Sequence, residues 1–290
     1  MFRGTFSALI TPFKDGALDE RCFRDLIEWQ IQEGVNGIVP CGSTGEAATL
    51  SHDEHEQAIK IAIEQARGRV PVLAGTGSNC TAEAIRLTRS AREAGADGAL
   101  LISPYYNKPT QEGIFQHYKE IAASVDLPLV VYNIPGRTGS NIMPETLARL
   151  AKVPHIAGVK ESSGSMEQTS EIVHLCGERF VVLSGDDSLT LPLISLGAQG
   201  VISVVTNVMP RRMCELVDHA MRGDFARARK VHYELLPVMR AMFVETNPIP
   251  VKYAAFLLGK CGPEVRLPLT PLSRASQQRV RTAMVEAGLL

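Results

Sequence analysis

A short apolar run, a turn and a longer stretch of helical period follow one another repeatedly along most of the chain. This alternation predicts parallel strands joined by helical crossovers. The candidate strands cover residues 7–13, 37–42, 71–75, 98–103, 128–134, 156–160, 180–184 and 200–205. Eight consecutive β–α units are most simply closed into a (β/α)₈ barrel, because closure leaves no exposed sheet edge.

The stretches between these runs are candidate helices with boundary signals of their own. They cover residues 20–33, 52–67, 82–94, 111–124, 144–151, 167–175, 189–196 and 210–221. Ser51 followed by Glu54, and Ser165 followed by Gln168, predict capping boxes. Glycines stand just past five of the expected helix ends, at Gly34, Gly68, Gly95, Gly177 and Gly197.

The pattern changes after the eighth unit. Three further helices are expected from residue 225 onward, separated by Asn247-Pro248 and by a proline-containing stretch at 263–271. We therefore expect a catalytic barrel of residues 1–224 and a C-terminal helical region of residues 225–290. A chain of 290 residues lies within the range that barrels with added helices reach.

The charge and hydropathy of the chain argue against nucleic acid and membrane as partners. The formal net charge is −1, and no long block of Lys or Arg offers a field for phosphate backbones. No run of about 18 apolar residues and no signal-peptide layout is present in the sequence. We expect a cytoplasmic protein.

Six cysteines are spread along the chain without a CxxC pair. This spacing fits neither a disulfide framework nor a zinc site, so we expect buried free thiols and no bound metal. The cysteines are Cys22, Cys41, Cys80, Cys176, Cys214 and Cys261.

Barrel enzymes carry their chemistry where strands end, and Lys160 ends the apolar run 156–159. Burial at the barrel mouth would lower the pKa of its amine, and a neutral amine can attack a ketone to form an imine. The same position would also suit an ion pair with Glu161 or a phosphate ligand. Position alone leaves these alternatives open.

Polar residues follow two other strands. Ser43 and Thr44 lie in a glycine-flanked loop that suits a small carboxylate, although a plain tight turn has the same composition. Tyr132 ends an apolar strand and could transfer protons if Thr44 hydrogen-bonds it, or could simply be a packing residue. Arg137 follows in a loop with Gly and Pro, as a carboxylate ligand or as a surface arginine.

Six stretches together form a pattern that none of them forms alone. They cover residues 42–50, 104–109, 131–139, 158–161, 183–187 and 245–252. With them the chain resembles the pyruvate-dependent class I aldolases of the N-acetylneuraminate lyase superfamily. The resemblance is greatest to the branch that serves diaminopimelate and lysine biosynthesis, and it runs from Met1 to Leu290.

The resemblance implies how the first substrate would be held. Lys160 would form an imine with pyruvate, and Ser43 and Thr44 would bind the pyruvate carboxylate. Gly185 and Ile202 would add main-chain contacts. Serine at position 43 replaces the first of two threonines usual in this branch, which keeps the hydroxyl group.

The resemblance also implies the second half of the reaction. Tyr132, Thr44 and Tyr106 would form a proton relay, with Tyr106 reaching across a dimer interface. Arg137 would fix the carboxylate of L-aspartate-4-semialdehyde, which condenses with pyruvate. No metal or organic cofactor is implied, and a homotetramer built as a dimer of dimers is expected.

Three other functions compete with this interpretation. A sister aldolase that cleaves N-acetylneuraminate or a similar 2-keto sugar acid would share Lys160 but lack Arg137. A phosphate-binding barrel isomerase would need a glycine-rich phosphate loop where Asp186 and Asp187 stand. A non-catalytic binding barrel would be expected to lose Lys160 or Tyr132.

A further polar cluster has no place in the catalytic hypothesis. His52 and His55 are three positions apart on one predicted helix, and Asn79, Glu83 and Tyr105 come later. A solvated helix start would have the same composition, and no third ligand makes a metal site. The resemblance implies an L-lysine pocket at a dimer interface, with Glu83 pairing the ligand's ammonium and Tyr105 its carboxylate. Partial inhibition by L-lysine is therefore expected.

Overall fold

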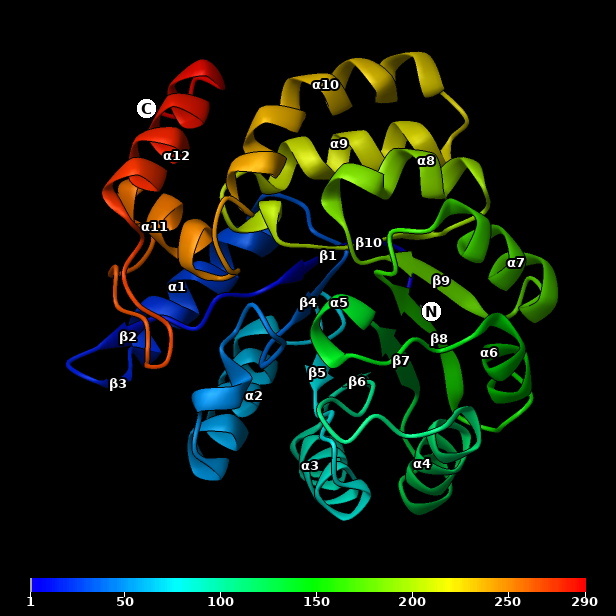
Figure 1. The fold of residues 1–290 in the computed structure, drawn as a ribbon. Coiled ribbons are helices and arrows are strands. Elements are labelled where there is room, and N and C mark those ends of the chain that lie inside the picture. Colours follow the sequence, from blue (N-terminus) through cyan, green and yellow to red (C-terminus); the bar gives the residue numbers. More distant parts are fainter. Residues whose placement is uncertain (1) are drawn as a thin grey trace.

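Eight parallel strands form the wall of a barrel in residues 2–290, which are the residues described by the computed structural model (Figure 1). They are β1 (Gly4–Ala8), β4 (Gly37–Val39), β5 (Leu73–Gly75), β6 (Gly98–Ile102), β7 (Leu129–Asn133), β8 (Ile156–Glu161), β9 (Val181–Ser184) and β10 (Gly200–Ser203). Their order is β4-β1-β10-β9-β8-β7-β6-β5. A parallel bridge between Ile38 and Val72 joins the two ends, which confirms the predicted (β/α)₈ barrel.

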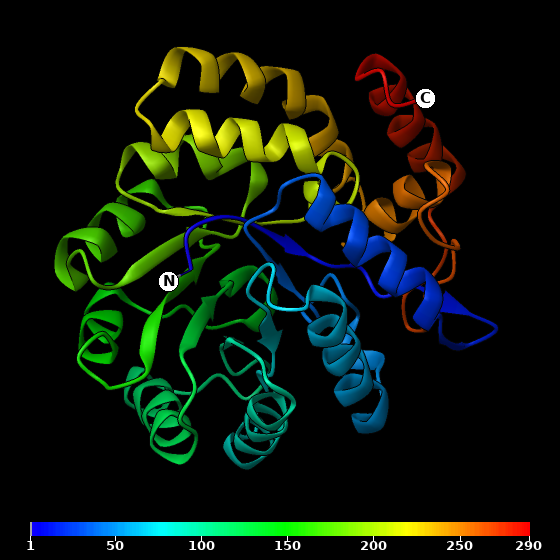
Figure 2. The ribbon, with the colours of Figure 1, turned by 180° about the vertical axis from the view of Figure 1, so that it is seen from behind.

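Helices surround the strands in both views (Figure 1, Figure 2). They are α1 (Glu20–Gln32), α2 (His52–Ala66), α3 (Thr81–Ala94), α4 (Gln111–Ser124), α6 (Pro144–Leu150), α7 (Met166–Cys176), α8 (Thr190–Ser195) and α9 (Pro210–Met221). Each corresponds to a predicted helix, with ends that differ by at most a residue or two. No helix in the described residues is long and apolar enough to cross a membrane.

One of the two predicted capping boxes is present. At α2 the Ser51 hydroxyl accepts from the backbone N–H of Glu54, whose carboxylate accepts from the N–H of Ser51. At α7 the prediction was wrong in one half. The Ser165 hydroxyl accepts from the backbone N–H of Gln168, as predicted. The Gln168 side chain is hydrogen-bonded to the Asn141 side chain instead of to the backbone N–H of Ser165.

The first strand begins and ends earlier than predicted. β1 ends at Ala8, and Phe13 belongs instead to a small hairpin of β2 (Phe13–Lys14) and β3 (Ala17–Leu18). Pro12 has no N–H to extend a ladder, and Asp15 and Gly16 adopt positive φ angles that turn the chain sharply. The hairpin, which the sequence analysis missed, lies beside the C-terminal region (Figure 1).

Three helices follow the barrel, α10 (Phe225–Ala241), α11 (Ile249–Leu257) and α12 (Arg274–Glu286). α10 packs on α9 and α12, and α12 packs on α11. They share one hydrophobic cluster with barrel residues such as Ile27 and Ile59, to which Leu235, Val251 and Val280 contribute. The C-terminal region therefore has no separate core in the described residues.

The barrel interior has its own apolar cluster, which includes Phe6, Leu100, Leu183 and Ile202. Tyr132 belongs to it as well, so this tyrosine faces the interior. All six cysteines are free, as expected, but only Cys41, Cys214 and Cys261 are buried. Cys22 and Cys176 are half-buried and Cys80 is exposed, because all three lie at or near helix ends.

Candidate active site

Lys160 and Tyr132 lie side by side inside the barrel. They are direct partners in the β7–β8 ladder, and the Lys160 Nζ atom lies 4.2 Å from the centroid of the Tyr132 ring. Both residues are buried, with 5% and 6% of their surface exposed. A lysine in this setting is an amine held against an aromatic wall with little access to water.

Glu161 does not pair with this lysine. Successive strand residues point to opposite faces, so Glu161 turns outward, away from the barrel interior. Its carboxylate accepts from the amide of Asn133 at 3.0 Å and from the N–H of Ser163 at 2.7 Å. Among the described residues Lys160 makes no ion pair with any carboxylate, so the ion-pair alternative for this position is wrong.

Burial lowers the pKa of Lys160 to about 8, below its ordinary value near 10.5. Asp186 and Asp187 act in the opposite direction, because nearby negative charge favours the ammonium, and the Arg137 guanidinium adds to the lowering. Burial is also the main reason that the pKa of Tyr132 is raised. The site therefore holds a partly neutral amine beside a phenol that keeps its proton.

Gly185 packs directly against β8. A Cβ atom at this position would overlap the Ser162 hydroxyl and lie 2.9 Å from Cε of Lys160, so only glycine fits. The Gly185 N–H donates to the Glu161 carbonyl at 2.8 Å. Ser162, which the sequence analysis missed, has a buried hydroxyl without a hydrogen-bond partner in the described residues.

The loop between β4 and α2 brings Thr44 and Ser43 to the barrel mouth. Thr44 is buried, and its hydroxyl accepts from the side-chain amide of Asn247 at 3.0 Å. Ser43 is half-buried. The expected hydrogen bond between Thr44 and Tyr132 is absent from residues 2–290, where Asn247 is the Thr44 partner.

Arg137 lies in the short helix α5 (Pro135–Thr138), which follows β7. Its Nη2 atom donates to the backbone carbonyl of Asn247 at 2.9 Å. Asn247 thus contacts both Thr44 and Arg137, although 110 positions separate it from the arginine. No role was predicted for Asn247, because its place before Pro248 in the sequence offers no signal of these contacts.

A cavity of about 560 Å³ opens at this end of the barrel. Its walls include seven of the predicted site residues, together with Asn247, for which no role was predicted. The seven are Ser43, His52, His55, Glu83, Tyr105, Tyr132 and Arg137. Lys160 is not part of the cavity wall, but it contacts Tyr132, which is. Gly185 and Ile202 are not part of the cavity wall; Ile202 is fully buried and Gly185 is half-buried.

The adjacent residues Tyr105 and Tyr106 have different surroundings. Tyr105 lines the cavity, whereas Tyr106 is 88% exposed and has a φ angle of 72°. Its N–H donates to the Thr138 carbonyl at 3.3 Å. Within one chain, Tyr106 therefore stands apart from Lys160 and Tyr132.

The predicted regulatory residues gather beside the same cavity. His52 and the Glu83 carboxylate are 3.0 Å apart, and Asn79 donates to the Tyr105 carbonyl at 3.2 Å. A hydrogen bond from Ser78 is the main reason that the pKa of Glu83 is lowered, and a hydrogen bond from His52 lowers it further. Both favour the carboxylate form of Glu83.

His55 differs from His52, because it is buried and hydrogen-bonded to the Gly75 carbonyl at 2.8 Å. Burial lowers its pKa, so it is held as the neutral imidazole. Across residues 2–290 no three His, Cys, Asp or Glu side chains come together as metal ligands.

Comparisons with known proteins agree with this geometry. The model of the dihydrodipicolinate synthetase family matches residues 1–287. The 4-hydroxy-tetrahydrodipicolinate synthase of Nitratidesulfovibrio vulgaris (strain DP4) is 59% identical over 290 residues, which cover 100% of this chain and 99% of that protein.

Two solved structures are also similar. Dihydrodipicolinate synthase from Acinetobacter baumannii complexed with pyruvate has a TM-score of 0.98 and 44% identity, with 100% of each chain covered. The enzyme from Cyanidioschyzon merolae with lysine bound has a TM-score of 0.96 and 40% identity, covering 100% of this chain and 99% of that one. The chain belongs to the dihydrodipicolinate synthetase family.

Proposed function

We propose that this protein is a lyase that condenses pyruvate with L-aspartate-4-semialdehyde to give 4-hydroxy-tetrahydrodipicolinate, in diaminopimelate and lysine biosynthesis. The observation that carries the proposal is the buried amine of Lys160, which has a lowered pKa and lies against Tyr132. The relatives reported above are named for this activity. We expect the enzyme to act in the cytoplasm.

In the proposed reaction, the neutral Lys160 amine attacks the keto carbon of pyruvate, and loss of water leaves a protonated imine. The imine withdraws electrons, so a proton leaves the methyl group and an enamine forms. The enamine carbon then bonds to the aldehyde carbon of the second substrate. Attack by that substrate's own amino group closes the ring and releases Lys160. This chemistry calls for no metal or organic cofactor.

The two carboxylates of the substrates would have separate ligands. Ser43 and Thr44 would bind the pyruvate carboxylate, and the support for this is that Ser43 lines the cavity. Gly185 and Ile202 would contribute main-chain contacts. Arg137, also on the cavity wall, would bind the carboxylate of the aldehyde by a charge-assisted hydrogen bond.

Proton transfer would run through Tyr132, Thr44 and a Tyr106 supplied by a second copy of the chain. The support for a shared site is Tyr106 itself, a large aromatic side chain that is almost fully exposed in a single chain. A dimer is the minimum assembly for this arrangement. A tetramer formed from two such dimers is the assembly that we expect.

L-Lysine is the proposed inhibitor, bound by His52, His55, Asn79, Glu83 and Tyr105. Glu83 offers a carboxylate to the ammonium of lysine, and its pKa is lowered, so it carries charge at neutral pH. The C. merolae enzyme described above was solved with lysine bound. Because Tyr105 adjoins Tyr106, a ligand on one tyrosine can bias the relay through the other.

Borohydride reduction in the presence of pyruvate tests the proposal. We expect intact-mass spectrometry to find one reduced pyruvyl group per chain, peptide mapping to place it on Lys160, and activity to be lost. An unmodified Lys160 peptide after complete treatment would refute the mechanism. Faster turnover of N-acetylneuraminate than of pyruvate with the semialdehyde would assign the chain to the lyase branch instead.

A further inference from the structure

Glu46 holds the β4–α2 loop in a backbone conformation that residues with side chains rarely adopt. Its φ and ψ angles are 53° and 35°, in the left-handed region, two positions after Thr44. This conformation costs free energy for any residue other than glycine, so it persists only where surrounding contacts fix it. The loop that carries Ser43 and Thr44 therefore depends on what holds Glu46.

The Glu46 carboxylate is held by the C-terminal region. Its Oε1 atom lies 2.6 Å from Nζ of Lys252 in α11, and both side chains are fully buried. Its Oε2 atom accepts from the backbone N–H of Arg266 at 3.1 Å. These partners are 206 and 220 positions away along the chain, and they use both carboxylate oxygens.

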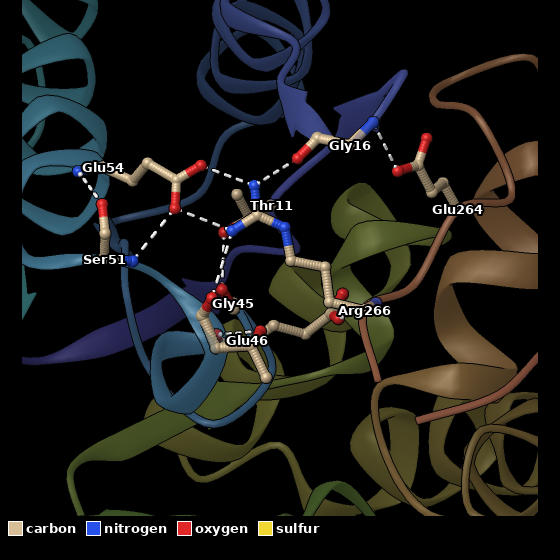
Figure 3. Close-up of polar contacts among 9 residues, drawn as sticks. Thr11, Gly16, Gly45, Glu46, Ser51, Glu54, Glu264 and Arg266 are labelled. Carbon is tan, nitrogen blue, oxygen red and sulfur yellow. Dashed lines mark hydrogen bonds and ion pairs between the residues drawn. The ribbon is translucent and has the colours of Figure 1, made fainter. Parts of the chain in front are cut away.

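The Arg266 side chain adds further contacts between the C-terminal region and the N-terminal part of the chain (Figure 3). Its guanidinium donates to both carboxylate oxygens of Glu54, at 2.7 and 2.5 Å, and to the carbonyl of Thr49 at 3.1 Å. It also donates to the Gly16 carbonyl in the β2–β3 hairpin at 2.6 Å. One arginine therefore joins the end of the loop, the first turn of α2 and the hairpin.

Phe13 contacts both cations. Nζ of Lys252 and Cζ of Arg266 each lie 4.2 Å from the centroid of its ring. Cations at this distance are attracted to an aromatic face, most strongly where water is excluded. Phe13 thus adds an aromatic contact to Lys252 and to Arg266, and it joins the hairpin to both of them.

We infer that Glu46, Lys252 and Arg266, here called the Glu46 clamp, are positioning residues for the carboxylate of the 2-keto acid. They act through Ser43 and Thr44, whose loop they fix, and they do not touch the reacting atoms. The inference rests on the proposed function, because it takes Ser43 and Thr44 as the ligands of that carboxylate. Releasing the clamp should weaken pyruvate binding and leave the Lys160 chemistry intact.

The double variant Glu46→Gly with Lys252→Met tests this. It removes both charges together, so no unpaired charge is left buried, and glycine adopts the left-handed conformation easily. We expect KM for pyruvate to rise about 10- to 100-fold, because small displacements of binding groups have effects of this size. At saturating pyruvate, kcat should stay within about threefold and borohydride should still trap the imine.

Glu264→Gln is the matched control. Glu264 accepts from the Gly16 N–H at 2.8 Å, so it joins the C-terminal region to the hairpin but does not contact Glu46 (Figure 3). We expect KM for pyruvate to stay within about twofold of the wild type in this variant. Arg266→Lys keeps the charge and the backbone N–H. We expect it to raise KM for pyruvate, but by less than the double variant does.

The outcomes separate this inference from the proposed function. If the wild type is not trapped by borohydride with pyruvate, the proposed function fails. If the wild type is trapped, an unchanged pyruvate KM in a folded double variant overturns the clamp, whether or not kcat falls. Should the double variant not fold, an unchanged pyruvate KM in Arg266→Lys overturns it equally.

Discussion

The Lys160 Nζ atom lies 4.2 Å from the centre of the Tyr132 ring, in neighbouring strands of the barrel. Burial lowers the pKa of this amine to about 8, so the neutral form predominates above that pH. Because only the neutral amine attacks the keto carbon, we expect imine formation to accelerate up to about pH 8 and then level off. Borohydride quenching at a series of pH values measures this rate of imine formation. A rate still rising at about pH 10 would indicate an ordinary lysine.

The same shift predicts a change in stability. In the unfolded chain Lys160 keeps its proton up to about pH 10.4, whereas the folded protein releases it near pH 8. The free energy of unfolding therefore rises with pH between these values, and below pH 8 the buried charge destabilises the fold. We expect Lys160→Met to be more stable than the wild type by up to about 3 kcal/mol at pH 7, and by much less near pH 10.

Urea unfolding at the two pH values measures this difference. Lys230→Met, which replaces an exposed lysine on α10, is the control and should show no such pH dependence. A Lys160→Met protein that is less stable than the wild type at pH 7 would contradict the burial of a charged amine at this position.

Arg137→Ala should impair use of the second substrate selectively. A charge-assisted hydrogen bond contributes to the free energy with which the enzyme binds the carboxylate of the second substrate. Its loss should therefore lower kcat/KM for L-aspartate-4-semialdehyde about 100-fold. Formation of the pyruvate imine should be almost unchanged, as borohydride trapping would measure. Arg137→Lys keeps the charge and should lose less. Equal losses in both half-reactions would remove Arg137 from the aldehyde site.

Mixed subunits test whether Tyr106 acts across an interface. Tyr106→Phe and Lys160→Ala should each be nearly inactive, but a mixture whose subunits have exchanged should regain activity in sites that combine two intact residues. Native mass spectrometry can verify the exchange. Mixed oligomers without activity would show that each chain uses its own Tyr106 or none.

Glu83→Ala and His55→Ala should reduce inhibition by L-lysine while leaving uninhibited turnover within about threefold. Glu83 loses its carboxylate, and His55 loses its contact with the Gly75 carbonyl. Glu56→Ala, which breaks only an exposed ion pair with Arg86 on α2 and α3, is the matched control and should stay sensitive. Calorimetry that detects no binding of L-lysine to the wild type at millimolar concentration would end the proposal.

Much of the barrel follows from local patterns in the sequence. Strands such as β7 and β8 are apolar runs of the right length between helical stretches, and the chemistry proposed for Lys160 was inferred from its place near the end of one of them. These features depend on short-range periodicity and on one rule, that barrel sites lie at strand ends.

Other features depend on contacts between distant parts of the chain and could not be predicted. The Phe13 hairpin was missed because an apolar run continues through Pro12 without a change in period. Asn247 carries no local signal of its contact with Thr44, 203 positions away. Glu46 looks like an ordinary loop residue until Lys252 and Arg266 are placed beside it.

The long separation within the Glu46 clamp has a consequence for synthesis of the protein. A nascent chain that has emerged as far as residue 224 already contains all eight strands, but it lacks Lys252 and Arg266, the partners of the Glu46 carboxylate. Burying that charge alone would be costly, so the loop with Ser43 and Thr44 stays unfixed at this stage. The last helices to leave the ribosome therefore complete a loop that was among the first segments to emerge.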